Sequence, residues 1–247
     1  MSLIEIGPLP SDGTPVNRYN NVTSAEPTDV FGINLTSTSN INLALTNISE
    51  GDDADLKLYK DTNGNGEFDS GDQLVPNGTS RLGGNADDSI NFADQPAGLY
   101  FAEVSRYAPG SSGSVSYRLS ASTADPSNLI AIEYQLGNLS PTQDLSFPGQ
   151  VGNTDTSDIY AFSLGFSVDT NISLTGLSSD ADIRVMRDIN RNGIFDSNDQ
   201  IVSSTYGGTT SESINLDDAG NYFLQVYQYS GDTNYTLAFD NYSTSAV

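Results

Sequence analysis

The sequence contains no cysteine, no histidine and no tryptophan. Without thiolates and imidazoles, the chain cannot build the zinc or iron sites that depend on those groups. The same absences exclude Ser-His-Asp and Cys-His nucleophile systems, and no disulfide can hold the fold together. A cysteine-free, acidic chain rich in Asn, Asp, Gly and Ser suits a bacterial protein that is secreted or held at the cell surface, in calcium-rich surroundings.

Positive charge is scarce: 9 Lys and Arg residues stand against 32 Asp and Glu residues, for a formal net charge of −23. Nucleic acids and anionic membrane surfaces are bound by basic residues, so we expect neither as a partner. No apolar run is long enough to span a bilayer, so we expect no membrane insertion. The acidity is compatible with simple solubility, but the concentration of Asp in two loops favours partial neutralisation by divalent cations.

The start of the chain, Met1-Ser2-Leu3-Ile4, has neither a basic flank nor an apolar stretch of signal-peptide length. We expect residues 1–3 to be a cloning remnant and the chain to be a fragment of something longer. With 36% hydrophobic and 17% charged residues, the chain can bury a core. Its 247 residues suit one large domain or two ordinary ones.

A twelve-residue segment occurs twice. Residues 61–72 read Asp-Thr-Asn-Gly-Asn-Gly-Glu-Phe-Asp-Ser-Gly-Asp, and residues 188–199 read Asp-Ile-Asn-Arg-Asn-Gly-Ile-Phe-Asp-Ser-Asn-Asp. Both place oxygen-bearing side chains at positions 1, 3, 5, 9 and 12 and glycine at position 6, which is the pattern of a calcium loop. Calcium takes six to eight oxygen ligands, and glycine permits the sharp turn at position 6.

We therefore predict one calcium ion in each segment. Position 7 would contribute its backbone carbonyl, and the Phe at position 8 would anchor the loop in a core. The predicted ligands are Asp61, Asn63, Asn65, Glu67, Asp69 and Asp72 in the first segment, and Asp188, Asn190, Asn192, Ile194, Asp196 and Asp199 in the second. Three carboxylates per site, with Asp at position 12, predict modest affinity, on the order of 10⁻⁴ to 10⁻³ M. The alternative is a plain turn, since Asp, Asn and Gly also dominate turns.

The two segments sit at the centre of a longer repeat with a spacing of about 127 residues, the separation of Asp61 and Asp188 (188 − 61). Residues 54–59 match residues 181–186, and residues 98–104 match residues 220–226. Solenoid repeats are 20 to 50 residues long, so this period indicates tandem domains. We predict modules at residues 4–122 and 129–244, joined by a polar seam that contains Pro126.

Within each module, apolar residues alternate with polar or small ones, as in Ile41, Leu43 and Leu45. Such short runs, bounded by Gly, Asn, Asp and Ser, predict half-buried antiparallel strands. We expect about eight strands per module and no amphipathic helix. The predicted fold class is all-β, with two tandem antiparallel β-sandwiches of jelly-roll type.

The order of these motifs resembles a known family. The pattern Asp-x-Phe/Tyr-x-Ile/Phe-x-Leu at residues 29–35 and 158–164 is followed by Asp-Ala-Asp, Gly-x-Tyr-Phe and Tyr-x-Leu in both halves. This order is similar to that of bacterial pre-peptidase C-terminal domains, here in two copies, a β-sandwich family associated with collagenases. The resemblance implies non-catalytic modules appended to secreted peptidases and other exported proteins. The twelve-residue segments themselves resemble the calcium loops of dockerins, which also have Asp at position 12, more closely than they resemble this family.

Three other features have weaker functional interpretations. The aspartates of the repeated Asp-Ala-Asp motif precede the loops, and we assign Asp53, Asp55, Asp180 and Asp182 to turn capping. Asp69-Ser70-Gly71 imitates an aspartic-peptidase motif but lacks its apolar flanking strands. Tyrosines near the end of the Gly-x-Tyr-Phe strands could stack on sugars or prolines, but we favour a role as ordinary half-buried strand tyrosines. They are Tyr107, Tyr227 and Tyr229.

Together these observations predict a non-enzymatic, calcium-binding accessory module of a secreted bacterial protein, which supports attachment, spacing or secretion of a neighbouring domain. One alternative is an adhesin or a collagen- or glycan-binding module, whose partner is an extracellular protein or polysaccharide. A second alternative is a hydrolase that uses two carboxylates, since such a glycosidase needs no histidine. A groove with tyrosines or with paired acids would separate these functions.

Overall fold

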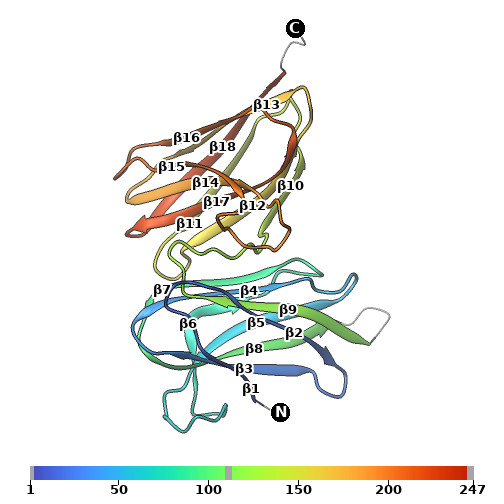
Figure 1. The fold of residues 1–247 in the computed structure, drawn as a ribbon, viewed down its shortest axis with the longest axis vertical. Helices are drawn as coiled ribbons and strands as arrows, with labels where there is room; N and C mark the ends of the chain where they lie inside the picture. The colour runs from blue at the N-terminus through green and yellow to red at the C-terminus, as the bar shows by residue number, and fades with distance from the viewer. Residues whose placement is uncertain (1–2, 109–112, 244–247) are drawn as a thin grey trace. The chain divides into compact units, whose positions relative to one another are not determined.

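The computed structural model describes residues 3–108 and 113–243, which form eighteen β-strands and no helix (Figure 1). The prediction of an all-β fold is confirmed. In these ranges no helix has the length and apolarity needed to cross a membrane. Met1 and Ser2, part of the expected cloning remnant, lie outside the described residues.

The chain divides into two compact units, Met1–Glu133 and Tyr134–Val247. The first contains nine strands: β1 (Leu3–Pro8), β2 (Val16–Thr23), β3 (Thr28–Leu35), β4 (Ser39–Thr46), β5 (Asp53–Lys60), β6 (Gln73–Ser80), β7 (Asp88–Gln95), β8 (Gly98–Ala108) and β9 (Ser114–Ser122). They form a five-stranded sheet in the order β1-β3-β8-β5-β6 and a four-stranded sheet in the order β2-β9-β4-β7. Apolar side chains from both sheets share one core.

The second unit also contains nine strands: β10 (Tyr134–Asn138), β11 (Leu145–Val151), β12 (Ser157–Leu164), β13 (Val168–Thr175), β14 (Asp180–Arg187), β15 (Gln200–Ser204), β16 (Glu212–Leu216), β17 (Gly220–Ser230) and β18 (Thr233–Ser243). The sheet orders are β10-β12-β17-β14-β15 and β11-β18-β13-β16. Adding nine to each strand number of the first unit gives the order in the second, so the two units have the same topology.

The alternating pattern of the sequence places one face of each sheet in the core. On β4 the side chains of Ile41, Leu43 and Leu45 are fully buried in the core of the first unit. On β13 those of Ile172 and Leu174 are buried in the same way in the second unit. Burying one such side chain stabilises the fold by about 1.5–3 kcal/mol, so these alternating runs are the main source of each unit's stability.

The first strand of each unit departs from the antiparallel pattern. β1 pairs with β3 in parallel, and β10 pairs with β12 in parallel. Both strands contain a register shift that ends at a glycine with positive φ, Gly7 at 83° and Gly137 at 71°. Glycine adopts this backbone conformation without the strain that a side chain would bring, so the repeated irregularity is specified by the sequence.

The segment after β9 packs against the first unit. Leu129 and Ala131 form a small buried cluster with Ala44 of β4. The Ile132 backbone N–H donates a hydrogen bond to Asp87 Oδ2 at 2.9 Å, and the Ser89 hydroxyl donates one to Glu133. These contacts extend the first unit to the residue before β10.

Candidate metal centres

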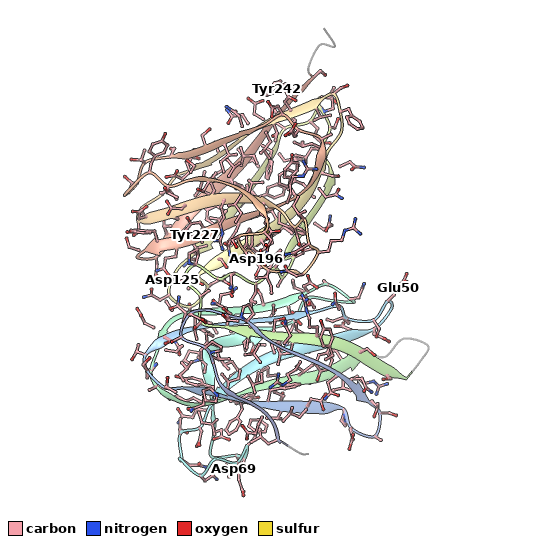
Figure 2. The ribbon with its side chains drawn as sticks, in the orientation of Figure 1. Glu50, Asp69, Asp125, Asp196, Tyr227 and Tyr242 are labelled. Atoms are coloured by element: carbon pink, nitrogen blue, oxygen red, sulfur yellow. The ribbon has the colours of Figure 1, made fainter. Side chains whose placement is uncertain are left out.

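The two twelve-residue segments occupy the same connection in their units. Residues 61–72 join β5 to β6, and the neighbouring strands pair from Lys60 and Gln73 onward. Residues 188–199 join β14 to β15, whose pairing includes Arg187 with Gln200. Each is therefore a hairpin loop between antiparallel strands, with no helix on either side. In the first unit, Asp69 lies on a loop that extends away from the sheets (Figure 2).

The aspartate at position 1 holds the turn of each loop. Asp61 accepts hydrogen bonds from the backbone N–H of Gly64 at Oδ1, 2.6 Å, and of Gly66 at Oδ2, 3.0 Å. Asp188 accepts them from Asn192 at Oδ1, 3.2 Å, and from Gly193 at Oδ2, 2.9 Å. The carboxylate at this position is thus aimed at the inside of the turn in both copies.

The two asparagines of each loop repeat the same contacts. In the first loop, Asn63 Oδ1 accepts from the Asn65 backbone N–H at 3.0 Å, and Asn65 Oδ1 accepts from that of Glu67 at 2.8 Å. In the second, Asn190 Oδ1 accepts from Asn192 at 3.0 Å, and Asn192 Oδ1 accepts from Ile194 at 2.9 Å. A carbonyl oxygen has two lone pairs, so these bonds leave acceptor capacity for a cation.

The side-chain NH₂ groups of these asparagines point to the aspartate at position 9. Asn63 and Asn65 donate to Asp69 at 3.1 and 2.7 Å. In the second loop, Asn190 and Asn192 donate to Asp196 Oδ2 at 3.4 and 2.7 Å.

Backbone donors add to these contacts at position 9. The Gly71 N–H, followed by the Asn65 amide, holds the pKa of Asp69 below its ordinary value. The Asn198 N–H, followed by the Asn192 amide, lowers the pKa of Asp196 in the same way. Both carboxylates are therefore fully ionised at neutral pH, the form that a cation requires.

Position 12 differs between the loops. Asp72 Oδ2 accepts from the Asp69 backbone N–H at 2.8 Å, while Asp72 Oδ1 is buried without a hydrogen-bond partner. Asp199 Oδ2 accepts from the Asp196 N–H at 3.1 Å, and Asp199 Oδ1 accepts from the Ile189 N–H at 3.1 Å. A buried carboxylate oxygen is costly unless it is paired, so Asp72 Oδ1 fits a bound cation.

The donor set at each loop consists of carboxylate and amide oxygens, which suits a hard cation such as calcium. Within residues 3–108 and 113–243, however, no three acidic side chains converge as a ready metal site. In each loop the carboxylate at position 9 is hydrogen-bonded by asparagine NH₂ groups instead of lying against the other carboxylates. The predicted position 7 ligands lie on the same turn, with Glu67 exposed and Ile194 half-buried.

The phenylalanine at position 8 is buried in the second loop, as predicted, but only half-buried in the first, where it lies outside the core. The Phe68 ring meets those of Tyr59 and Phe101 at centroid distances of 5.1 and 5.4 Å. Phe195 is 5% exposed, and the Arg184 guanidinium carbon lies 4.3 Å from its ring centroid. Both loops are therefore fastened to the five-stranded sheet of their own unit.

The aspartates of the Asp-Ala-Asp motif lie inside strands, so their assignment to turn capping was wrong. Asp53 and Asp55 belong to β5, and Asp180 and Asp182 belong to β14. Their backbones pair with neighbouring strands, because the strands begin at this motif rather than after it.

In each unit these aspartates lie near a further buried acid, Asp88 in the first and Glu212 in the second, which the sequence patterns did not predict. Asp88 opens β7 and Glu212 opens β16, and each accepts a hydrogen bond from a serine hydroxyl, Ser80 and Ser204 respectively. Burial, with the charges of Asp55 and Asp53 adding to it, raises the pKa of Asp88 to about 6. The sequence does mark both acids, since each directly precedes the repeated Ser-Ile-Asn segment.

The three tyrosines singled out above have different surroundings. Tyr107 and Tyr229 are exposed, at 74% and 72%. Tyr227 is buried, and the pKa of its hydroxyl is raised to about 12 by burial and by the charge of Asp182. Tyr227 is therefore a structural residue, whereas Tyr107 and Tyr229 are available for contact.

Residues 27–106 match the sequence model of the bacterial pre-peptidase C-terminal domain family. This range includes the first loop and most of the strands of the first unit. No curated protein matches the chain in sequence.

Among solved structures, the chain is similar to the pre-peptidase C-terminal domain of a Bacillus anthracis collagenase, with 22% identity over 49% of this chain and 94% of that one and a TM-score of 0.35. It is also similar to the Aeromonas hydrophila lysozyme inhibitor PliG, with 11% identity over 49% of this chain and 98% of that one and a TM-score of 0.31. The CUB1-EGF-CUB2 domains of rat MASP-1 are 5% identical over 96% of this chain and 99% of that one, with a TM-score of 0.30. At these scores the solved structures add nothing to the fold described above.

Proposed function

We propose that the chain is a non-catalytic pair of accessory modules from a secreted or cell-surface bacterial protein, in which each unit binds one calcium ion in its hairpin loop. The modules serve the attachment, spacing or secretion of a neighbouring domain in a longer chain. The single observation that carries the proposal is the repeated hydrogen-bond network of residues 61–72 and 188–199. The family match over residues 27–106 supports the accessory role.

In this proposal the carboxylates at positions 1, 9 and 12 and the amide oxygens at positions 3 and 5 face one ion. Calcium supplies a double positive charge that offsets the repulsion among these carboxylates. The chain's own residues hold the turn: Asp61 and Asp188 through backbone N–H groups, and Phe68 and Phe195 through ring contacts. Because these hydrogen bonds and ring contacts hold each turn beside the ion, calcium stiffens the sandwich rather than switching its conformation.

A thermal melt of the whole chain tests the proposal. At a free concentration 100-fold above the dissociation constant, one bound ion stabilises a fold by about 2.7 kcal/mol. Calcium should therefore raise the melting temperature relative to a chelator, and Asp61→Ala or Asp188→Ala should each remove part of the gain. Glu67→Ala is the matched control, because only the backbone carbonyl of position 7 would bind the ion. Equal melting temperatures with calcium and with chelator would refute calcium binding.

A recognition role is the second candidate, and the exposure of Tyr107 and Tyr229 favours it. Exposed aromatic rings stack on sugars and on proline-rich peptides. Under this hypothesis the wild-type chain binds a collagen peptide or a polysaccharide, and Tyr107→Ser or Tyr229→Ser weakens that binding without changing stability. If neither variant changes binding, the tyrosines have no recognition role.

A further inference from the structure

Three asparagines of the two loops are followed directly by glycine: Asn63-Gly64, Asn65-Gly66 and Asn192-Gly193. In such a pair the glycine backbone nitrogen can attack the asparagine side-chain carbon, since glycine has no Cβ to obstruct it. We propose that these three asparagines are self-deamidation sites, at which the first aspartate of the loop promotes the reaction. The expected effect of calcium on this reaction rests on the proposed function, whereas the reaction itself does not.

The attacking nitrogen already contacts a base in each case. Asp61 Oδ1 accepts the N–H of Gly64 at 2.6 Å, and Asp61 Oδ2 accepts that of Gly66 at 3.0 Å. Asp188 Oδ2 accepts the N–H of Gly193 at 2.9 Å. A carboxylate within hydrogen-bond distance of the N–H can take its proton as the nitrogen attacks, which is the geometry of general-base catalysis.

The carbon under attack is also activated. Its oxygen, Oδ1, becomes negatively charged during the attack, and in each pair it accepts the backbone N–H two residues later. The distances are 3.0 Å for Asn63, 2.8 Å for Asn65 and 2.9 Å for Asn192. A donor already aimed at the oxygen stabilises that charge without further reorganisation.

The covalent change is balanced by the groups present and by water. A bond forms between the glycine nitrogen and the asparagine side-chain carbon, and the bond from that carbon to Nδ2 breaks. The proton from the glycine nitrogen leaves with the side-chain NH₂ as ammonia, which yields a cyclic imide. Water then opens the imide to aspartate or isoaspartate, and Asn63 and Asn65 are exposed to solvent.

The two products have opposite consequences for the loop. Aspartate adds a carboxylate at position 3 or 5 and strengthens cation binding. Isoaspartate inserts one carbon into the backbone and disrupts the turn. A cation bound to Asp61 or Asp188 would occupy the base, so calcium should slow the reaction.

Asn190 is a control built into the molecule. It occupies position 3 of the second loop, as Asn63 does in the first, and its side chain makes the same two kinds of hydrogen bond. The next residue is Arg191, and Asp188 Oδ1 accepts the N–H of Asn192 rather than that of Arg191. Asn190 therefore lacks both the unhindered nucleophile and the base.

The experiment incubates the full chain at mildly alkaline pH with a chelator and follows each asparagine by peptide mass spectrometry, through the replacement of NH₂ by OH. We expect Asn63, Asn65 and Asn192 to react and Asn190 to remain intact. Asp61→Asn should slow the reaction at Asn63 and Asn65 by about tenfold or more, a conservative figure for loss of a general base. Asp188→Asn should slow only the reaction at Asn192, so each loop controls for the other.

The proposal is overturned if Asn190 reacts as fast as Asn192, or if Asp61→Asn leaves the rates at Asn63 and Asn65 unchanged or raises them. A parallel incubation with calcium separates it from the proposed function. Rates that are identical with calcium and with chelator would contradict calcium binding, while the effect of Asp61→Asn would still establish the deamidation.

Discussion

The two loops have the same length and ligand pattern, but they are fastened to their units differently. In the first, Phe68 is half-buried and meets two other aromatic rings, one in a T-shaped and one in a tilted arrangement. In the second, Phe195 is 5% exposed and lies under the Arg184 guanidinium group. The oxygen pattern and the anchoring of the loop are therefore specified by separate residues.

The loops differ again at position 12. Asp72 leaves one buried oxygen without a partner, whereas both oxygens of Asp199 accept backbone N–H groups. The first loop therefore depends more on a cation, and the second is closer to complete through its own hydrogen bonds.

The largest expected effect comes from removing the buried anchor. Phe195→Ala should lower the free energy of unfolding by about 3–5 kcal/mol, because a buried ring is replaced by a cavity. Phe68→Ala should cost less, since that ring already retains contact with water. Denaturant unfolding of the two variants with chelator measures both losses, and equal losses would contradict the difference in anchoring.

The next effect sharpens the comparison at position 12. With chelator, Asp72→Asn should modestly stabilise the first unit, since it removes the negative charge from a carboxylate whose buried Oδ1 has no hydrogen-bond partner. Asp199→Asn should destabilise the second unit, because one of two accepted hydrogen bonds loses its acceptor. With calcium, both substitutions should lower the melting temperature. A loss of stability in Asp72→Asn with chelator would show that the buried Oδ1 of Asp72 does not destabilise the fold.

The pH dependence of stability follows from two buried acids, Asp88 and Asp182. Burial raises the pKa values of Asp88 and Asp182 to about 6 from the ordinary 3.8, so the folded state holds their protons more tightly than the unfolded state. The resulting stabilisation is complete below about pH 4 and is lost as the pH rises through 6.

Urea unfolding at pH 5 and at pH 7, with chelator, measures this loss. Asp88→Asn should reduce the difference between the two pH values, on the order of 1–3 kcal/mol. Asp240→Asn, at an exposed position, is the control and should leave the difference unchanged. If both variants retain the full difference, burial of Asp88 does not contribute to the pH dependence.

The smallest effect concerns a pair that also differs between the units. Lys57 and Glu103 form an ion pair at 2.8 Å between β5 and β8, whereas Arg184 and Gln225 form a neutral-acceptor hydrogen bond at 2.7 Å at the equivalent place in β14 and β17. Glu103→Gln should cost about 0.2–1 kcal/mol. Its cost should shrink in high salt because charges are screened. A cost that does not change with salt would exclude an electrostatic origin.

Much of the fold could be predicted from the sequence. Alternating residues such as Ile41, Leu43 and Leu45 predicted strands because a period of two matches the alternating faces of a strand and not those of a helix. The repeat predicted that one architecture would occur twice. The parallel pairing of β1 with β3 could not be predicted, since strand direction depends on tertiary contacts that a short segment does not encode.

The candidate site was less predictable. Spacing alone predicted which oxygen side chains share one turn, because the residues of a loop are local in sequence. The proximity of Asp88 and Glu212 to the aspartates of β5 and β14 could not be predicted, since each lies far along the chain from them. The burial of Asp72 Oδ1 without a hydrogen-bond partner could not be predicted either, because the burial of one atom depends on packing.

Calcium stoichiometry distinguishes two metal-binding loops from two plain turns. Equilibrium dialysis of the full chain should find two ions bound, one per loop, with one left in Asp61→Ala or Asp188→Ala and none in the double variant. Glu67→Ala should retain both ions. Undiminished calcium binding by the double variant, or no binding by the unaltered chain, would contradict the account.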